Sequence, residues 1–293
     1  MSEIKNAQNV LNDPTKRIEE KMRALFYLRN VLTDESALII GDAIYKNTSV
    51  LLKHEMAYVL GQMKLQCSKE ILIKVLDDEN EDEVTRHECA EALGNFNDKE
   101  MVPILEKYLR HASLPLKETC YLAIKKIQES KDGVDLSKFD SRDPAIPLFK
   151  DINEQNIECA GKMLDDPNEC LYRKYKAMFY LRDCGTEKAK KFLVGAFKDE
   201  SALLKHELAF IMGQMRMDEG IEVLNKVMND GNEHGMVRHE AAEALGAIAT
   251  DDCYRYLQKN IDSDCDILRE SVLVALDVLR YENGEETEYA CVL

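Results

Sequence analysis

The chain of 293 residues contains a tandem duplication, and this duplication limits the folds that it can adopt. Residues 50–63 read VLLKHEMAYVLGQM, and residues 202–215, which lie 152 positions later, read ALLKHELAFIMGQM. Residues 84–96 and 236–248 match in the same way, as VTRHECAEALGNF and MVRHEAAEALGAI. Self-similarity of this kind indicates a protein built from stacked repeats whose apolar faces cover one another.

Each half is itself repetitive. The unit H-E-x-A-x-x-L-G begins at residues 54, 87 and 239, and again at 206 with Met212 in place of leucine. Apolar residues inside these segments recur with a helical period, and further amphipathic segments that end in turn signals lie between them. This pattern predicts helix–turn–helix units close in length to HEAT-type repeats. The expected helix pairs span about 3–31, 35–64, 68–96 and 98–129, and then 152–183, 186–216, 219–248 and 251–281.

One segment breaks the period and indicates a division into two halves. Residues 130–151 contain Gly133, Pro144 and Pro147, which favour a connection over a helix. We therefore expect an N-terminal half of four HEAT-like repeats in residues 1–130 and a linker in residues 131–151. The C-terminal half, residues 152–293, would hold four more repeats and an acidic tail after Tyr281.

The residues with the clearest chemical meaning are four His-Glu dipeptides. Two such dipeptides on adjacent stacked helices offer two imidazoles and two carboxylates, which are ligands for catalytic metals. If the two halves face each other across a pseudo-two-fold axis, all four dipeptides converge on one cleft with room for two metal ions. The ligand set permits iron, manganese, zinc or nickel. The dipeptides are His54-Glu55, His87-Glu88, His206-Glu207 and His239-Glu240.

The outer repeats give an internal comparison for these histidines. Histidine occurs in the aligned slot only in the two central repeats of each half, which a purely structural role would not require. His111, near a helix end, and His234, in a loop or at a helix start, lie outside the pattern. In the outer repeats the slot is expected to hold Lys21-Met22, Lys117-Glu118, Lys174-Tyr175 and Arg269-Glu270.

Glycine follows each of the four histidines by seven residues, which is two helical turns along the same face. Two interpretations are open: the glycines permit close packing of neighbouring helices, or they leave space for ligands and a substrate. Met63 and Met215 have the same two interpretations, as core residues or as walls of a pocket. The glycines are Gly61, Gly94, Gly213 and Gly246.

Composition limits the compartment and the partners. The formal net charge is −16, which disfavours nucleic acid and anionic membranes as partners and favours a cationic protein or a polyamine-like substrate. The nine cysteines form no C-x-x-C pair, the N-terminal residues do not resemble a signal peptide, and no apolar run reaches the length of a membrane span. These features predict a cytoplasmic protein with reduced thiols.

Simpler sites are excluded by the sequence. The zinc motif H-E-x-x-H and the Glu-x-x-His motif of helix-bundle di-iron proteins are both absent, and so are glycine-rich phosphate loops. Two alternatives remain besides an oxygen-using enzyme. The first is a HEAT-repeat scaffold that binds other proteins, and the second is a zinc- or manganese-dependent hydrolase.

The duplicated halves, the central His-Glu pairs and the linker sequence SRDPAIPLF (141–149) together resemble the deoxyhypusine hydroxylase family. The resemblance covers about residues 15–281 and all eight motif positions, although the family's linker usually has a second proline where this chain has Ile146. It implies an all-α solenoid of eight helix pairs, in two pseudo-symmetric halves that face a di-metal cleft.

The resemblance also implies an activity, a non-haem di-iron monooxygenase with two Fe(II) ions and O₂ as co-substrate. Its substrate would be eukaryotic translation initiation factor 5A carrying deoxyhypusine, with electrons from a donor that the sequence does not identify. Glu55 and Glu207 would then bind the substrate. One iron would be held by His54, His87 and Glu88, and the other by His206, His239 and Glu240.

Overall fold

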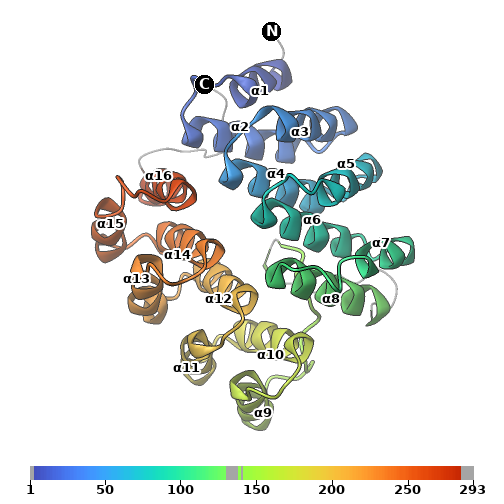
Figure 1. Cartoon of the computed structure of the whole chain (residues 1–293). Helices are drawn as coiled ribbons and strands as arrows, with labels where there is room; N and C mark the ends of the chain where they lie inside the picture. Colours follow the sequence, from blue (N-terminus) through green and yellow to red (C-terminus); the bar gives the residue numbers. More distant parts are fainter. Residues whose placement is uncertain (1–2, 130–137, 140, 285–293) are drawn as a thin grey trace. The chain divides into compact units, whose positions relative to one another are not determined.

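A computed structural model describes residues 3–129, 138–139 and 141–284 of the chain. Every regular element in these residues is a helix, so the predicted all-α class is confirmed. The helices form two compact units, α1–α8 and α9–α16 (Figure 1). None of the helices in the described ranges is long and apolar enough to cross a lipid bilayer. Residues 131–137 and 140 of the expected linker, and the acidic tail from residue 285 onward, lie outside the described residues.

The first unit consists of four helix pairs, with the boundaries expected from the repeats to within a few residues. Its helices are α1 Glu3–Asn12, α2 Ile18–Val31, α3 Asp34–Lys46, α4 Val50–Met63, α5 Gln66–Asp77, α6 Glu83–Asn95, the 3-10 turn Lys99–Met101 with α7 Val102–Glu106, and α8 Leu114–Glu129.

The second unit repeats this order, and the eight predicted helix pairs are thereby confirmed. Its helices are α9 Glu154–Asp165, α10 Leu171–Cys184, α11 Glu187–Gly195 with the 3-10 turn Ala196–Lys198, α12 Ala202–Gln214, the 3-10 turn Asp218–Gly220 with α13 Ile221–Asn229, α14 Gly235–Ile248, α15 Asp251–Gln258, and α16 Asp266–Glu282.

Each unit has two layers of helices. In the first unit α2 packs on α4, α4 on α6 and α6 on α8, while α1, α3 and α5 form the other layer (Figure 1). In the second unit α10, α12, α14 and α16 stack in the same manner. The His-Glu dipeptides lie on α4 and α6 and on α12 and α14, so the two helices that carry them are neighbours in each unit.

The glycines that follow the histidines permit these helices to approach closely. A Cβ atom added at Gly61 of α4 would lie 2.6 Å from the Cβ of Ala92 on α6, a distance that real side chains do not reach. Gly213 of α12 packs against Ala244 of α14 in the same way, because a Cβ atom added at Gly213 would lie 3.0 Å from the Cα of Ala244. The packing interpretation of the glycines is therefore confirmed, since each one meets the next helix and not an open space.

The described part of the expected linker packs on α10 within the second unit. The guanidinium of Arg182, which is fully buried, donates to both carboxylate oxygens of Asp143 at 2.9 and 2.6 Å. Its plane also lies over the rings of Phe139 and Phe179, 4.7 and 4.8 Å from their centroids. Two charges that neutralise each other at such short range, with stacking on aromatic rings, hold this segment against α10.

Candidate metal centre

The four repeated histidines occupy the same place in their helices. Each is the fifth residue after the N-cap, because the N-caps of α4, α6, α12 and α14 are Ser49, Asp82, Ser201 and His234. The side chain of each N-cap accepts a hydrogen bond from a backbone N–H of the first turn. This bond sets the start of the helix and so determines the face on which the histidine lies.

The same count corrects the alignment expected for the outer helices, which is one residue too early. The outer helices have no histidine at this position, so only their N-cap residues show which residue is equivalent to it. Ser113 accepts from the backbone of Leu116 before α8, and the N-caps of α2, α10 and α16 are also defined. Histidine still occurs only in the central repeats. The residues in the histidine slot of α2, α8, α10 and α16 are Met22, Glu118, Tyr175 and Glu270.

In the first unit, α4 and α6 bring two imidazoles and a carboxylate together. The ring centroids of His54 and His87 are 5.4 Å apart, and His54 Nε2 lies 3.4 Å from Glu88 Oε2. One ligand atom from each of these three residues lies within 4.8 Å of the other two, and all three residues are buried. Glu55 lies on the other side of the same imidazole, with its Oε1 atom 3.1 Å from His54 Nδ1. Glu88 is therefore placed to share a cation with the histidines, whereas Glu55 contacts the far nitrogen of one ring.

The pKa of His54 reveals the electrostatic character of this cluster. Burial lowers this pKa, but the hydrogen bonds to Glu55 and Glu88 and the charges of both carboxylates raise it by more, so that it lies well above the ordinary value. A positive charge next to these buried carboxylates is therefore favourable. A proton supplies that charge when His54 is an imidazolium, and a metal ion that displaces the proton supplies it as well.

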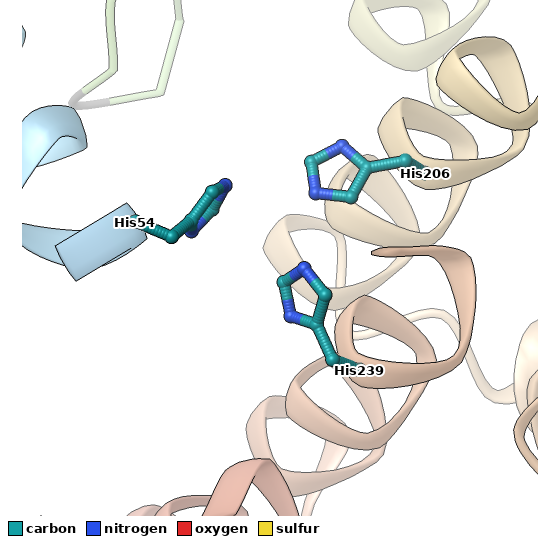
Figure 2. Close-up of side chains that lie close together, drawn as sticks. All are labelled: His54, His206 and His239. Carbon is teal, nitrogen blue, oxygen red and sulfur yellow. The ribbon is translucent and has the colours of Figure 1, made fainter. Parts of the chain in front are cut away.

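In the second unit, α12 and α14 produce the same arrangement. The ring centroids of His206 and His239 are 5.4 Å apart, and His206 Nε2 lies 3.4 Å from Glu240 Oε2. Figure 2 shows both rings projecting on the same side of their two helices, and it also labels His54, which belongs to α4 of the first unit. Glu207 follows His206 and is buried with it. These two distances match those of the first unit, although among the described residues only the group in the first unit has all three ligand atoms within 4.8 Å of one another.

The donor set fits a metal ion. Each unit presents two imidazole nitrogens and a carboxylate oxygen from buried residues, and two imidazoles with one carboxylate are a ligand set of non-haem iron enzymes. No cysteine belongs to the groups of candidate ligands found within the described part of the chain. Side chains of this kind are buried at a cost unless they hold a cation between them. The three ligand atoms of the first unit can therefore hold a divalent ion and leave coordination positions open for other groups, and the second unit presents the same residue types.

The remaining two histidines have local roles. His234 is the N-cap of α14, and its Nδ1 accepts from the backbone of Met236 at 3.2 Å, in agreement with the expected helix start. His111 is half-buried just before α8, where its Nδ1 accepts from the backbone of Ser113 at 3.1 Å. Neither belongs to the metal-ligand candidates.

Sequence reasoning missed one interaction at the second site. Glu243 lies one turn after His239 on α14 and contacts its Nδ1 atom. The i, i+4 spacing was visible in the sequence, but the same spacing occurs at many exposed positions. The partner that distinguishes this glutamate, Ser271, lies on α16 and is found only in the folded protein.

The chain matches the family model of HEAT repeats in both units, over residues 41–125 and 189–277. Fold and site together define a HEAT-repeat protein with a histidine–carboxylate cluster in each of two duplicated units. Proteins similar to the chain identify one family within this class. Deoxyhypusine hydroxylase of Candida albicans is 42% identical over 94% of this chain and 91% of its own length. That of Schizosaccharomyces pombe is 41% identical over 96% and 92%.

A solved structure agrees with these relatives. The structure of human deoxyhypusine hydroxylase in complex with glycerol is 34% identical to this chain, with a TM-score of 0.89 over 95% of this chain and 96% of the human one. The chain belongs to the deoxyhypusine hydroxylase family. It is an enzyme of the hydroxylase type, as its resemblance to that family implies.

Proposed function

We propose that this enzyme hydroxylates the deoxyhypusine side chain of eukaryotic translation initiation factor 5A and converts it to hypusine. The observation that carries the proposal is the cluster of two imidazoles and a carboxylate in the first unit, with the same residue types paired in the second, in a chain 42% identical to a deoxyhypusine hydroxylase over nearly its full length. We assign the metal-binding role to His54, His87 and Glu88 in the first unit. In the second unit the same role belongs to His206, His239 and Glu240.

Two Fe(II) ions bound to these residues would supply the oxidising chemistry, in which one atom of O₂ enters a C–H bond and the other leaves as water with two electrons and two protons. The protein would keep the imidazole rings oriented and their nitrogens available, because α4 and α6, like α12 and α14, are packed closely at their glycines. Burial of the cluster excludes bulk water from the reacting groups.

We assign substrate binding to Glu55 and Glu207. Both carboxylates are buried, with 8% and 4% of their surfaces exposed, so a bulky cation cannot reach them. Deoxyhypusine is a long, slender aliphatic chain with ammonium groups, and such a chain can carry its charge to a buried carboxylate. Charge-assisted hydrogen bonds from these groups would fix the chain with its reacting carbon near the metals.

The reaction belongs in the cytoplasm in this proposal. Eight cysteines in the described residues are free thiols, which supports a reducing compartment. The net charge of −16 supports a basic protein as the partner over nucleic acid or an anionic membrane.

The test is mass spectrometry of factor 5A bearing deoxyhypusine after incubation with the iron-loaded enzyme, a reductant and air. We expect the mass of one added oxygen atom, and we expect no change without O₂. The variants His54→Ala and His206→Ala should lose this activity and part of their bound iron while the helical content stays near that of the wild type. An unmodified substrate with the iron-loaded wild type would refute the proposal. Turnover of another substrate without O₂ by the zinc-loaded protein would favour a hydrolase, and a folded protein that binds no metal would favour a scaffold.

A further inference from the structure

Glu243 links a metal-ligand histidine to a second helix. It lies on α14 four residues after His239, and its Oε1 atom is 3.4 Å from His239 Nδ1. The same oxygen accepts a hydrogen bond from the hydroxyl of Ser271 on α16, at 2.9 Å. His239 and Ser271 are both fully buried, and the side chain of Glu243 is 21% exposed. Three side chains from two helices thus form one chain of contacts that ends at the imidazole.

The chemistry of these groups determines which nitrogen of His239 carries the proton. A carboxylate oxygen accepts hydrogen bonds and cannot donate them, so Nδ1 is the protonated nitrogen when it contacts Glu243. Nε2 then keeps its lone pair, which is the pair that a metal ion needs. A carboxylate on the far nitrogen of a ligand histidine also makes the imidazole more basic and fixes the ring plane.

The bond from Ser271 makes this arrangement more than a contact within one helix. A glutamate side chain on a helix surface samples several rotamers, and ordering it costs conformational entropy. The hydroxyl on α16 holds Oε1 in the position that faces His239. A buried donor from a different helix therefore restricts Glu243 before any metal binds.

In the first unit the residues that match His239 and Glu243 are His87 and Glu91, which have the same i, i+4 spacing. The residue of α8 that matches Ser271 is Thr119, whose hydroxyl donates to the carbonyl of Pro115 in its own helix at 2.9 Å. The hydroxyl at this position of the last helix thus has different partners in the two units, Glu243 in the second and a carbonyl of its own helix in the first.

We propose that Glu243 is a positioning residue for the metal ion of the second unit and that Ser271 holds it in place. This inference rests on the proposed function, because it assumes that His239 binds a metal. Removal of the Glu243 carboxylate lowers the affinity of the second unit for a divalent ion by roughly 10- to 100-fold, the usual effect of losing such a partner. Removal of the Ser271 hydroxyl acts in the same direction with a smaller effect.

The experiment is a calorimetric titration of the full metal-free chain with Co(II), alongside the visible absorption of the bound ion. In Glu243→Ala one class of Co(II) sites weakens by the stated factor and its absorption band shifts, whereas in Glu243→Gln the loss is smaller because the amide oxygen still accepts from Nδ1. Ser271→Ala gives an intermediate result. Circular dichroism of the metal-free variants establishes that they fold.

Glu222→Ala is the matched control, since Glu222 also accepts a hydroxyl hydrogen bond from the next helix of its layer, from Tyr256 at 2.8 Å, but lies away from the histidines. Wild-type affinity for Co(II) in Glu243→Ala, or an equal loss in Glu222→Ala, overturns the inference and leaves the proposed function standing. A wild-type protein that binds no Co(II) or Fe(II) overturns the proposed function and this inference together.

Discussion

At the scale of single residues, the two carboxylates beside His54 have different tasks although they look alike in the sequence. Glu88 faces Nε2, on the side of the candidate metal-binding cluster, and Glu55 faces Nδ1. A dipeptide repeated four times therefore does not use its glutamates in one way. The neighbouring helix decides which carboxylate faces the ligand nitrogen.

This difference predicts that two isosteric variants lose different properties. Glu88→Gln should lose most of the metal bound to the first unit, because a neutral amide oxygen is a much weaker ligand. Glu55→Gln should keep the metal and raise the KM for the substrate about tenfold, which corresponds to roughly 1.4 kcal/mol of lost binding. Metal analysis and steady-state kinetics on the same preparations measure both. Loss of iron from Glu55→Gln would move this carboxylate into the ligand set.

The cysteines provide a pH-dependent prediction. Burial raises the pKa of Cys120 to about 12, whereas Cys159 and Cys170 are exposed. Because the thiolate is the reactive form, the folded protein should show rapid modification of the two exposed cysteines at pH 8 and none of Cys120 up to about pH 10. Peptide mapping after treatment with iodoacetamide measures this, with the unfolded protein as control. Equal labelling of Cys120 and Cys159 in the folded state would contradict it.

At the scale of helices, the close contacts between neighbouring helices of one layer are possible because glycine has no side chain. Gly61 meets Ala92, and Gly94 meets Ala123 in the next pair of helices. Glycine inside a helix costs about 1 kcal/mol relative to alanine, so its presence here has to be offset by packing. The helices that carry the ligands are held together at these contacts.

Gly61→Ala should therefore lower the free energy of unfolding by about 1–3 kcal/mol, because the added methyl group forces α4 and α6 apart. Gly195→Ala is the control, since nothing lies within 4 Å of a Cβ atom at that helical position. It should be neutral or stabilising by up to about 1 kcal/mol. Urea denaturation of the metal-free proteins measures both. Equal stability of the two variants would rule out the contact as the cause.

The pairing of Asp143 with Arg182 gives a second prediction at this scale. Asp143→Ala removes the bidentate partner of a buried guanidinium that keeps its two hydrogen bonds to Asp183, so we expect a cost of about 1.5–3 kcal/mol. The melting temperature should fall by several degrees. Glu154→Ala removes a partner from the exposed Lys188 and should leave the melting temperature nearly unchanged. A comparable drop in both variants would indicate that Asp143 acts in another way.

The sequence was sufficient for the helix pairs because the repeat and the helical period agree over the whole array. It was sufficient for the residues that form the clusters because His-Glu recurs only in the central helices. It was insufficient for the alignment of the outer helices, because nothing in the sequence shows that Met22 and Tyr175 are equivalent to the histidines. Contacts such as that of Asp143 with Arg182, or of Ser271 with Glu243, join residues far apart in the chain, and no local pattern specifies them.

At the scale of the whole molecule, charge governs the encounter with a partner. The formal net charge of −16 attracts a basic protein at long range, and dissolved salt screens this attraction. The proposal that the two units contribute their clusters to one shared cleft remains a prediction. The salt dependence of the reaction can be measured independently of it.

An increase in NaCl from about 50 to 300 mM should lower kcat/KM for the protein substrate roughly three- to tenfold, with the effect mainly in KM. A substrate variant with neutral residues around the modified side chain serves as control and should respond weakly. Equal salt dependence for both substrates would mean that screening acts elsewhere, for example at the metal site.

The contact between Gly61 and Ala92 also has a consequence for the chemistry. Gly61 lies two turns beyond His54 on the same face of α4, and it packs directly against Ala92 of α6. The separation of the helix axes there also sets how far apart the two imidazoles lie. The space for an ion between the two rings would thus depend on a position about 10 Å along the helix, where glycine lacks the methyl group of alanine.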